Sequence, residues 1–311
     1  MRNAGPAELV MGSAQLGLDY GAANRNGKPA REVALRLVSR AIDGGITSFD
    51  TARAYGDAEE RLAEGLAGRR PTRTITKLAP LSELAPDAPH QAVLAAVDAS
   101  LAQSRVALRR DCLDCLLLHR ANHITAYDGA IWNRLKEHLA GGLIAALGVS
   151  VQSVAEALRA LAEPCVTHIQ LPFNLLDWRW RDGGVIAALQ SQRPDVTVHA
   201  RSIFLQGVLT AGDLSVWRRL PGADAPRIVA WLQETATAFG RDSVADLALA
   251  YARGQSWIDG VVVGQETERQ LDDNLRLCAR APLSAQDCAL IESAAPRMPE
   301  KLLDPAQWAP Q

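Results

Sequence analysis

Residues 45–66 read GITSFDTARAYGDAEERLAEGL, and this stretch contains the unit from which the fold can be predicted. The apolar and β-branched run at residues 46–50 predicts a strand, and a helix is expected to begin near Ala58. Asp50 stands at the end of the strand, and Tyr55 lies in the short connection before the helix. The same order of strand, polar residue and helix recurs along the chain.

Seven further runs have the short apolar pattern of strands that are buried on both faces of a parallel sheet. They are residues 9–14, 73–77, 112–119, 144–150, 166–171, 196–202 and 258–264. Amphipathic segments such as residues 32–42 and 90–101 stand between them and predict helices with one apolar stripe. Eight strands alternating with helices predict a (β/α)8 barrel that forms a single domain over residues 1–311. An open doubly wound sheet is the alternative, but no G-x-G-x-x-G follows the first strand.

Composition argues against several classes of partner. The 311 residues include 33 basic and 35 acidic side chains, for a net charge of −2, and like charges do not cluster into a block. We therefore expect no binding to nucleic acid and no polybasic contact with a membrane. The first residues do not resemble a secretory signal, and no apolar run approaches the ~18 residues that span a bilayer. Five cysteines, an odd number, predict a reduced, cytoplasmic protein.

Cys112 and Cys115 form a C-x-x-C, a spacing found in metal and redox sites. If both lie on the strand predicted at residues 112–119, their side chains point to opposite faces, because residues three apart on a strand do so. Such thiols can neither share a metal ion nor close a normal disulfide. We expect two packing residues and no metal site.

Polar residues stand at the ends of the predicted strands, which in a barrel meet at one mouth. Taken singly, each has a structural interpretation, such as an aspartate that caps a helix or a histidine packed in the core. Together, at successive strand ends, they favour an active site. The residues are Asp50, Lys77, His119, Ser150, Gln170 followed by Asn174, and Arg201 followed by Ser202.

At this point the sequence resembles the aldo-keto reductase family. The matching positions are Gly45, Asp50, Thr51, Ala52, Tyr55, Gly56, Glu59, Lys77, His119, GVS at 148–150, QLPFN at 170–174, and Asp273 with Asn274. The resemblance extends over nearly the whole chain. It implies an NAD(P)H-dependent oxidoreductase that reduces a small aldehyde or ketone, sugar-derived ones included, to the alcohol.

The resemblance also implies roles for four catalytic residues. Tyr55 would be the general acid. A phenol has a pKa near ~10 and is a poor proton donor at neutral pH unless a neighbouring cation favours the phenolate, and Lys77 would be that cation. Asp50 would pair with Lys77, and His119 would hydrogen-bond the substrate carbonyl. Tyr55 and His119 would then stabilise the negative charge that develops on the oxygen.

The cofactor contacts implied by the family depart from its usual pattern in places. Ser150 and Gln170 would hold the nicotinamide carboxamide, but Val151 stands where asparagine is common. Arg201 stands where an aromatic ring often stacks, and it is either a stacking guanidinium or a salt-bridged residue of the rim. Ser202 completes this group of contacts.

The adenine end would meet Gly264, Gln265, Glu266 and Asn274. NADP is the family default. However, Glu266 disfavours a 2′-phosphate, and Arg269 is the one nearby cation, so NAD stays open.

Two other functions fit these residues. Some proteins of this fold are auxiliary subunits of potassium channels, and Lys77 could be the nucleophile of a Schiff-base aldolase. The substrate depends on loops such as residues 121–129 and 203–219. The aromatic residues Trp178, Trp180, Phe204 and Trp217 predict either an apolar wall that stacks on sugars or ordinary loop packing. The oligomeric state cannot be predicted from the sequence.

Overall fold

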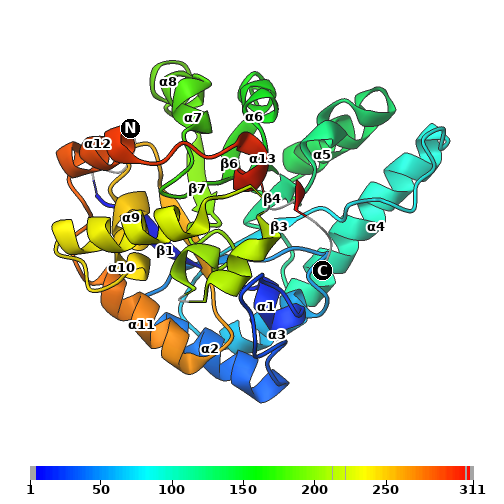
Figure 1. Cartoon of the computed structure of the whole chain (residues 1–311). Coiled ribbons are helices and arrows are strands. Elements are labelled where there is room, and N and C mark those ends of the chain that lie inside the picture. The colour runs from blue at the N-terminus through cyan, green and yellow to red at the C-terminus, as the bar shows by residue number, and fades with distance from the viewer. Residues whose placement is uncertain (1–4, 212, 221, 305–306, 309–311) are drawn as a thin grey trace.

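The computed structural model describes residues 5–211, 213–220, 222–304 and 307–308, and in these residues eight parallel strands close into a barrel (Figure 1). Each strand pairs with the next along the chain, and β8 pairs with β1. The strands are β1 (Glu8–Gly12), β2 (Ser48–Asp50), β3 (Arg73–Lys77), β4 (Cys115–Leu118), β5 (Leu147–Ser150), β6 (Val166–Pro172), β7 (Thr197–Arg201) and β8 (Gly260–Gly264). The predicted (β/α)8 barrel is confirmed.

Helices connect the strands and surround the barrel (Figure 1). The α-helices are α1 (Ala14–Gly17), α2 (Arg31–Asp43), α3 (Ala58–Leu66), α4 (His90–Leu108), α5 (Ala130–Ala140), α6 (Val154–Leu161), α7 (Arg179–Asp182), α8 (Val185–Ser191), α9 (Ala225–Ala238), α10 (Val244–Arg253), α11 (Glu268–Cys278), α12 (Ala285–Ala294) and α13 (Glu300–Leu303). Short 3-10 turns are η1 (Ala121–Ile124), η2 (Ala126–Gly129), η3 (Val208–Thr210) and η4 (Leu214–Arg219). No helix of the described residues combines the length and the apolar character that crossing a membrane requires.

The apolar stripe predicted for residues 32–42 faces the barrel. In α2 the buried residues Ala34, Leu37, Val38, Ala41 and Ile42 recur at intervals of one, three and four, which places them on one side of the helix. The helix α3 begins at Ala58 as predicted, and α4 runs to Leu108, beyond the predicted end at residue 101. The connection predicted at residues 203–227 is irregular apart from η3, η4 and the start of α9.

All eight predicted strands exist, but β4 is shorter than the predicted strand at residues 112–119. The backbone bends before Cys115, and Leu113 forms only an isolated bridge with Ile144. Asp114 accepts a hydrogen bond from the Thr74 amide at 2.9 Å and so takes part in the bend. Cys112 therefore lies outside β4, and the prediction that both cysteines belong to one strand is wrong. Cys115 is fully buried against Ile75 and Leu117, and all five cysteines are free thiols.

Strand register places the ends of β1, β2, β5 and β6 close together at the mouth. Gly12 pairs with Asp50 across β1 and β2, and Ser150 pairs with Gln170 across β5 and β6. Because paired residues of parallel strands project to the same side, the polar residues at these ends share one end of the barrel interior.

Candidate active site

Lys77 and Asp50 form a buried ion pair at the mouth of the barrel. The Lys77 side chain is 1% exposed, and its Nζ donates to both Asp50 carboxylate oxygens at 2.8 Å and to the Thr51 carbonyl at 2.9 Å. Burial lowers the pKa of Lys77, but the nearby Asp50 carboxylate and Tyr55 raise it by more than burial lowers it, so the pKa lies above its ordinary value. Lys77 is therefore a fixed positive charge at neutral pH.

Tyr55 and His119 lie beside this ion pair. The two rings meet edge to face with centroids 5.8 Å apart, and Lys77 Nζ is 5.0 Å from the centroid of the Tyr55 ring. Burial first, and then the positive charges of Lys77 and Arg201, lower the pKa of His119 to about 3. His119 is thus a neutral imidazole at physiological pH, with one N–H to donate. The structure brings all four predicted catalytic residues together.

The connection that carries Tyr55 is held from two sides. On one side, α1 packs so closely that a Cβ on Gly17 would lie 1.8 Å from the Tyr55 carbonyl oxygen. On the other, Arg53 forms an ion pair with Glu59, which is fully buried and accepts a hydrogen bond from the Thr76 hydroxyl at 2.6 Å. The sequence indicated Glu59 only as a position that matches the family. Its contacts show that it links the connection that carries Tyr55 to β3.

Gln170 is hydrogen-bonded to Asp50 of the ion pair, a contact that the sequence did not indicate. Its Nε2 donates to Asp50 Oδ1 at 2.6 Å, while its Oε1 is buried and has no hydrogen-bond partner among the described residues. A buried amide oxygen without a partner is costly, so a donor from a ligand would stabilise this site. Ser150, 4% exposed, pairs in register with Gln170.

Arg201 projects from the last position of β7 into the mouth. Its guanidinium donates to the Val151 carbonyl and to the Ser202 hydroxyl, each at 3.4 Å. Both acceptors are neutral groups, so the contacts do not match those expected of a salt-bridged residue of the rim. Arg201 instead links the end of β7 to the residue that follows Ser150.

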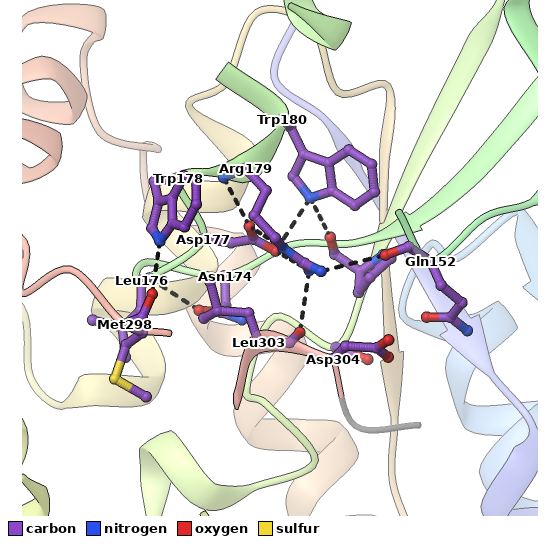
Figure 2. A network of polar contacts seen from close by, with 12 residues as sticks. Gln152, Asn174, Leu176, Asp177, Trp178, Arg179, Trp180, Met298, Leu303 and Asp304 are labelled. Atoms are coloured by element: carbon purple, nitrogen blue, oxygen red, sulfur yellow. Dashed lines mark hydrogen bonds and ion pairs between the residues drawn. The ribbon is translucent and has the colours of Figure 1, made fainter. Parts of the chain in front are cut away.

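A second buried ion pair braces the rim beyond β5 and β6. Arg179 is 2% exposed and pairs with Asp177, which is fully buried, at 2.7 Å. Figure 2 shows the Arg179 guanidinium directed toward the carbonyls of Gln152 and Leu303, to which it donates at 3.3 and 3.2 Å. The pair thereby joins the loops after β5 and β6 to the C-terminal segment, a connection that short-range patterns cannot reveal.

A cavity of about 650 Å³ runs from Asp50 and Tyr55 toward α11, while Lys77 and His119 lie outside its lining. Its lining includes Asp50 and Tyr55 at one end, and Glu266, Gln270, Asp273 and Asn274 at the other. Of the predicted cofactor contacts, Arg201, Ser202, Gly264, Glu266 and Asn274 line the cavity. The other three lie outside its lining and are buried: Ser150 (4% exposed), Gln170 (0%) and Gln265 (2%).

The four aromatic residues, left open by the sequence between a wall of the substrate site and loop packing, lie mostly outside the cavity. Trp180 is fully buried and donates to the Pro172 carbonyl, and Trp217 is 2% exposed in the core. Trp178 donates to the Met298 carbonyl (Figure 2), so it serves to hold the C-terminal segment. Phe204 alone of the four lines the cavity. The interpretation as ordinary loop packing was therefore right for the three tryptophans.

Four polar residues of the cavity lining were not predicted as a group. Tyr20, Asn24, Arg25 and Gln206 come from the loops after β1 and β7. These loops touch where the Ala23 amide donates to the Gln206 carbonyl at 3.2 Å. Their contact depends on how two distant segments fold toward each other, which no local pattern indicates.

Comparisons with known proteins give one consistent result. Residues 8–296 match the model of the aldo/keto reductase family. A curated relative, the 6-dehydroglucose reductase of Novosphingobium aromaticivorans, is 33% identical over 137 residues, which are 40% of this chain and 43% of that protein.

Solved structures share the fold. The holo form of an aldo-keto reductase from Bacillus halodurans superposes with a TM-score of 0.74 at 20% identity, over 96% of this chain and 97% of that chain. A Pseudomonas aeruginosa structure assigned to the aldo-keto reductases has a TM-score of 0.64 at 21% identity, over 88% and 90% of the two chains.

Proposed function

Because the chain belongs to the aldo/keto reductase family, we propose that it is an NAD(P)H-dependent oxidoreductase that reduces a small aldehyde or ketone to the alcohol. One observation carries the proposal. A buried Lys77–Asp50 pair lies beside Tyr55 and a neutral His119, at the end of a cavity long enough to extend to α11. This is an arrangement that can supply a proton and stabilise an oxyanion.

Tyr55 is the proton donor in this proposal. The phenol gives its proton to the carbonyl oxygen, and the fixed charge of Lys77 stabilises the phenolate that is left. Asp50 holds Lys77 through both carboxylate oxygens, which keeps the ammonium protonated and in place. His119 is neutral, so it donates a hydrogen bond to the substrate oxygen and orients it but does not act as an imidazolium acid.

The residues present fit a nicotinamide dinucleotide. Arg201 lines the cavity, and the unpartnered Gln170 Oε1, buried with Ser150 behind the lining, would accept a carboxamide N–H if the lining opened to admit it. The cavity then continues past Gly264 toward Asn274, where the adenosine half would lie. The bound cofactor supplies the hydride, because the side chains of the chain contain no hydride donor.

The cavity favours a polar, hydroxylated substrate. Its lining includes the hydroxyl and amide groups of Tyr20, Asn24 and Gln206, and the Arg25 guanidinium, which pairs with Asp213 at 3.0 Å. Such groups match the hydroxyls of a sugar-derived carbonyl compound. The name of the Novosphingobium relative, a 6-dehydroglucose reductase, supports the same class of substrate.

The geometry disfavours the aldolase alternative. A Schiff-base lysine must lose its proton to attack a carbonyl. Lys77 has a raised pKa, donates three hydrogen bonds and is 1% exposed. No observation specifically favours an auxiliary subunit.

A panel assay tests the proposal. Purified protein is mixed with NADH or NADPH and with aldehydes, ketones and aldoses, and cofactor oxidation is followed by absorbance at the nicotinamide band. We expect turnover with at least one carbonyl compound that bears hydroxyl groups. Borohydride added with the same carbonyl compounds should trap no adduct on Lys77. Trapping without cofactor oxidation would favour the aldolase instead.

A further inference from the structure

We propose that this chain is selective for NAD(H) over NADP(H), because carboxylates occupy the end of the cavity where the adenosine ribose would lie. The inference rests on the proposed function and adds the identity of the cofactor to it. It departs from the NADP default that the family resemblance implies.

The shape of the cavity assigns its two ends. Hydride transfer requires the nicotinamide ring to lie near the substrate carbonyl, and hence near Tyr55. The other half of an extended dinucleotide must then follow the cavity to its far end, between β8 and α11. That end is lined by Glu266, Gln270, Asp273 and Asn274.

Two of these four residues are acidic, and neither of the others is basic. Glu266 is half-buried, and the Asp273 side chain is 52% exposed. A ribose 2′-phosphate carries a charge of about −1.5 to −2 at neutral pH. The Glu266 carboxylate repels it, whereas a free 2′-hydroxyl can donate a hydrogen bond to that carboxylate.

The arginines near this end, Arg36, Arg269 and Arg276, lie outside the cavity lining. Arg269, which the sequence left as the candidate for a phosphate contact, has a side chain that is 93% exposed, lies 4.0 Å from Asp273 and is not part of the cavity lining. Arg36 pairs with Glu268 at 2.8 Å. Glu268 lies outside the cavity lining, whereas Asp273 belongs to it and also lies 3.8 Å from Arg276. Glu266 is therefore the carboxylate at this end that has no ion pair among the described residues.

The start of α11 also offers few amides to a phosphate. The Gln270 side-chain oxygen accepts from the amides of Glu266 and Thr267, at 2.8 and 3.1 Å. The Thr267 hydroxyl accepts from the Gln270 amide at 3.2 Å. This reciprocal cap occupies donors that an anion would need at a helix N-terminus.

Equilibrium binding tests the inference without turnover. Isothermal titration calorimetry of the purified protein with NADH and with NADPH should show NADH binding at least about ten-fold more tightly, a typical effect of a nearby like charge at a partly exposed site. 5′-AMP and adenosine 2′,5′-bisphosphate, which differ only by the 2′-phosphate, should show the same order when used as competitors of NADH.

Glu266 variants locate the effect. Glu266→Arg should bring the NADPH and NADH affinities together or reverse them, a change of about ten-fold or somewhat more. Glu266→Gln, a smaller change, should narrow the gap in the same direction. Glu234→Arg, which makes the same change of charge at an exposed position on α9 outside the cavity lining, should leave the ratio unchanged.

The contrary results are distinct. Equal or tighter binding of NADPH by the parent protein would overturn the inference. So would an unchanged ratio in both Glu266 variants, or an Arg269→Gln variant that loses affinity for NADPH alone. Failure of both NADH and NADPH to bind would instead refute the proposed function, because no dinucleotide would then use the cavity.

Discussion

Replacement of Lys77 by methionine should destabilise the protein strongly, because it leaves a buried carboxylate without its cation. Asp50 is 4% exposed, and after the change it would keep only the Gln170 amide among the side-chain donors described here. Loss of one partner from a buried pair typically costs about 3–5 kcal/mol. An exposed pair would cost at most about 1 kcal/mol.

A double-mutant cycle separates the ion pair from the general cost of each substitution. The four proteins are the parent, Lys77→Met, Asp50→Asn and the double variant. Asp50→Asn alone leaves the Lys77 ammonium buried without a counter-ion, with the Thr51 carbonyl and one neutral amide oxygen as its acceptors. The double variant should be more stable than the sum of the single losses predicts, by about 2 kcal/mol or more.

Urea unfolding followed by tryptophan fluorescence gives the four free energies of unfolding. The slope against urea must agree among the proteins for the comparison to hold. A loss below about 1 kcal/mol in Lys77→Met, or a coupling energy near zero, would refute the description of this pair as desolvated and mutually dependent.

Two further predictions concern packing and pH. Gly17→Ala should lower the rate of carbonyl reduction and cost about 1–3 kcal/mol of unfolding free energy, because the new Cβ would meet the Tyr55 carbonyl oxygen. Gly5→Ala, where nothing lies within 4 Å of the new Cβ, should match the parent protein in both the rate and the unfolding free energy. Burial holds the pKa of His168 well below its usual value and lowers that of His199 to about 3, while both imidazoles titrate near ~6.5 when unfolded. The unfolded state therefore binds more protons between these values. The free energy of unfolding should therefore fall by up to about 1.4 kcal/mol per imidazole for each pH unit below 6. Urea titrations from pH 7 to 4.5 should show a smaller fall for His199→Gln than for the parent protein. An equal fall in the two proteins would contradict the assignment of a lowered pKa to His199.

The fold could be predicted because its signals are local. The run ITSFD at residues 46–50 and the stripe in residues 32–42 depend on short spacing, and each became the expected element. Asp50, Lys77 and His119 could be grouped for a related reason. Once the strands are known to be parallel, their carboxyl ends must meet.

Contacts between distant segments could not be predicted in this way. The sequence left Trp180 open between a wall of the substrate site and loop packing, and the structure shows it fully buried, with its N–H donated to the Pro172 carbonyl. Arg269 was the one nearby cation that could meet a 2′-phosphate, yet its side chain is 93% exposed and lies 4.0 Å from Asp273. In both cases the direction of one side chain depends on tertiary packing and not on its neighbours in sequence. The bend before Cys115 has a similar origin, since Asp114 bonds to the neighbouring strand.

The most direct test of the account is the Tyr55→Phe variant. This change removes one hydroxyl from a half-buried ring and leaves the contacts of the Tyr55 backbone in place. We expect binding of the nicotinamide cofactor and the free energy of unfolding to stay close to those of the parent protein. The rate of carbonyl reduction should fall by about 10²-fold or more, the range expected for loss of a general acid. Turnover equal to that of the parent, with binding intact, would contradict the assignment of Tyr55 as the proton donor.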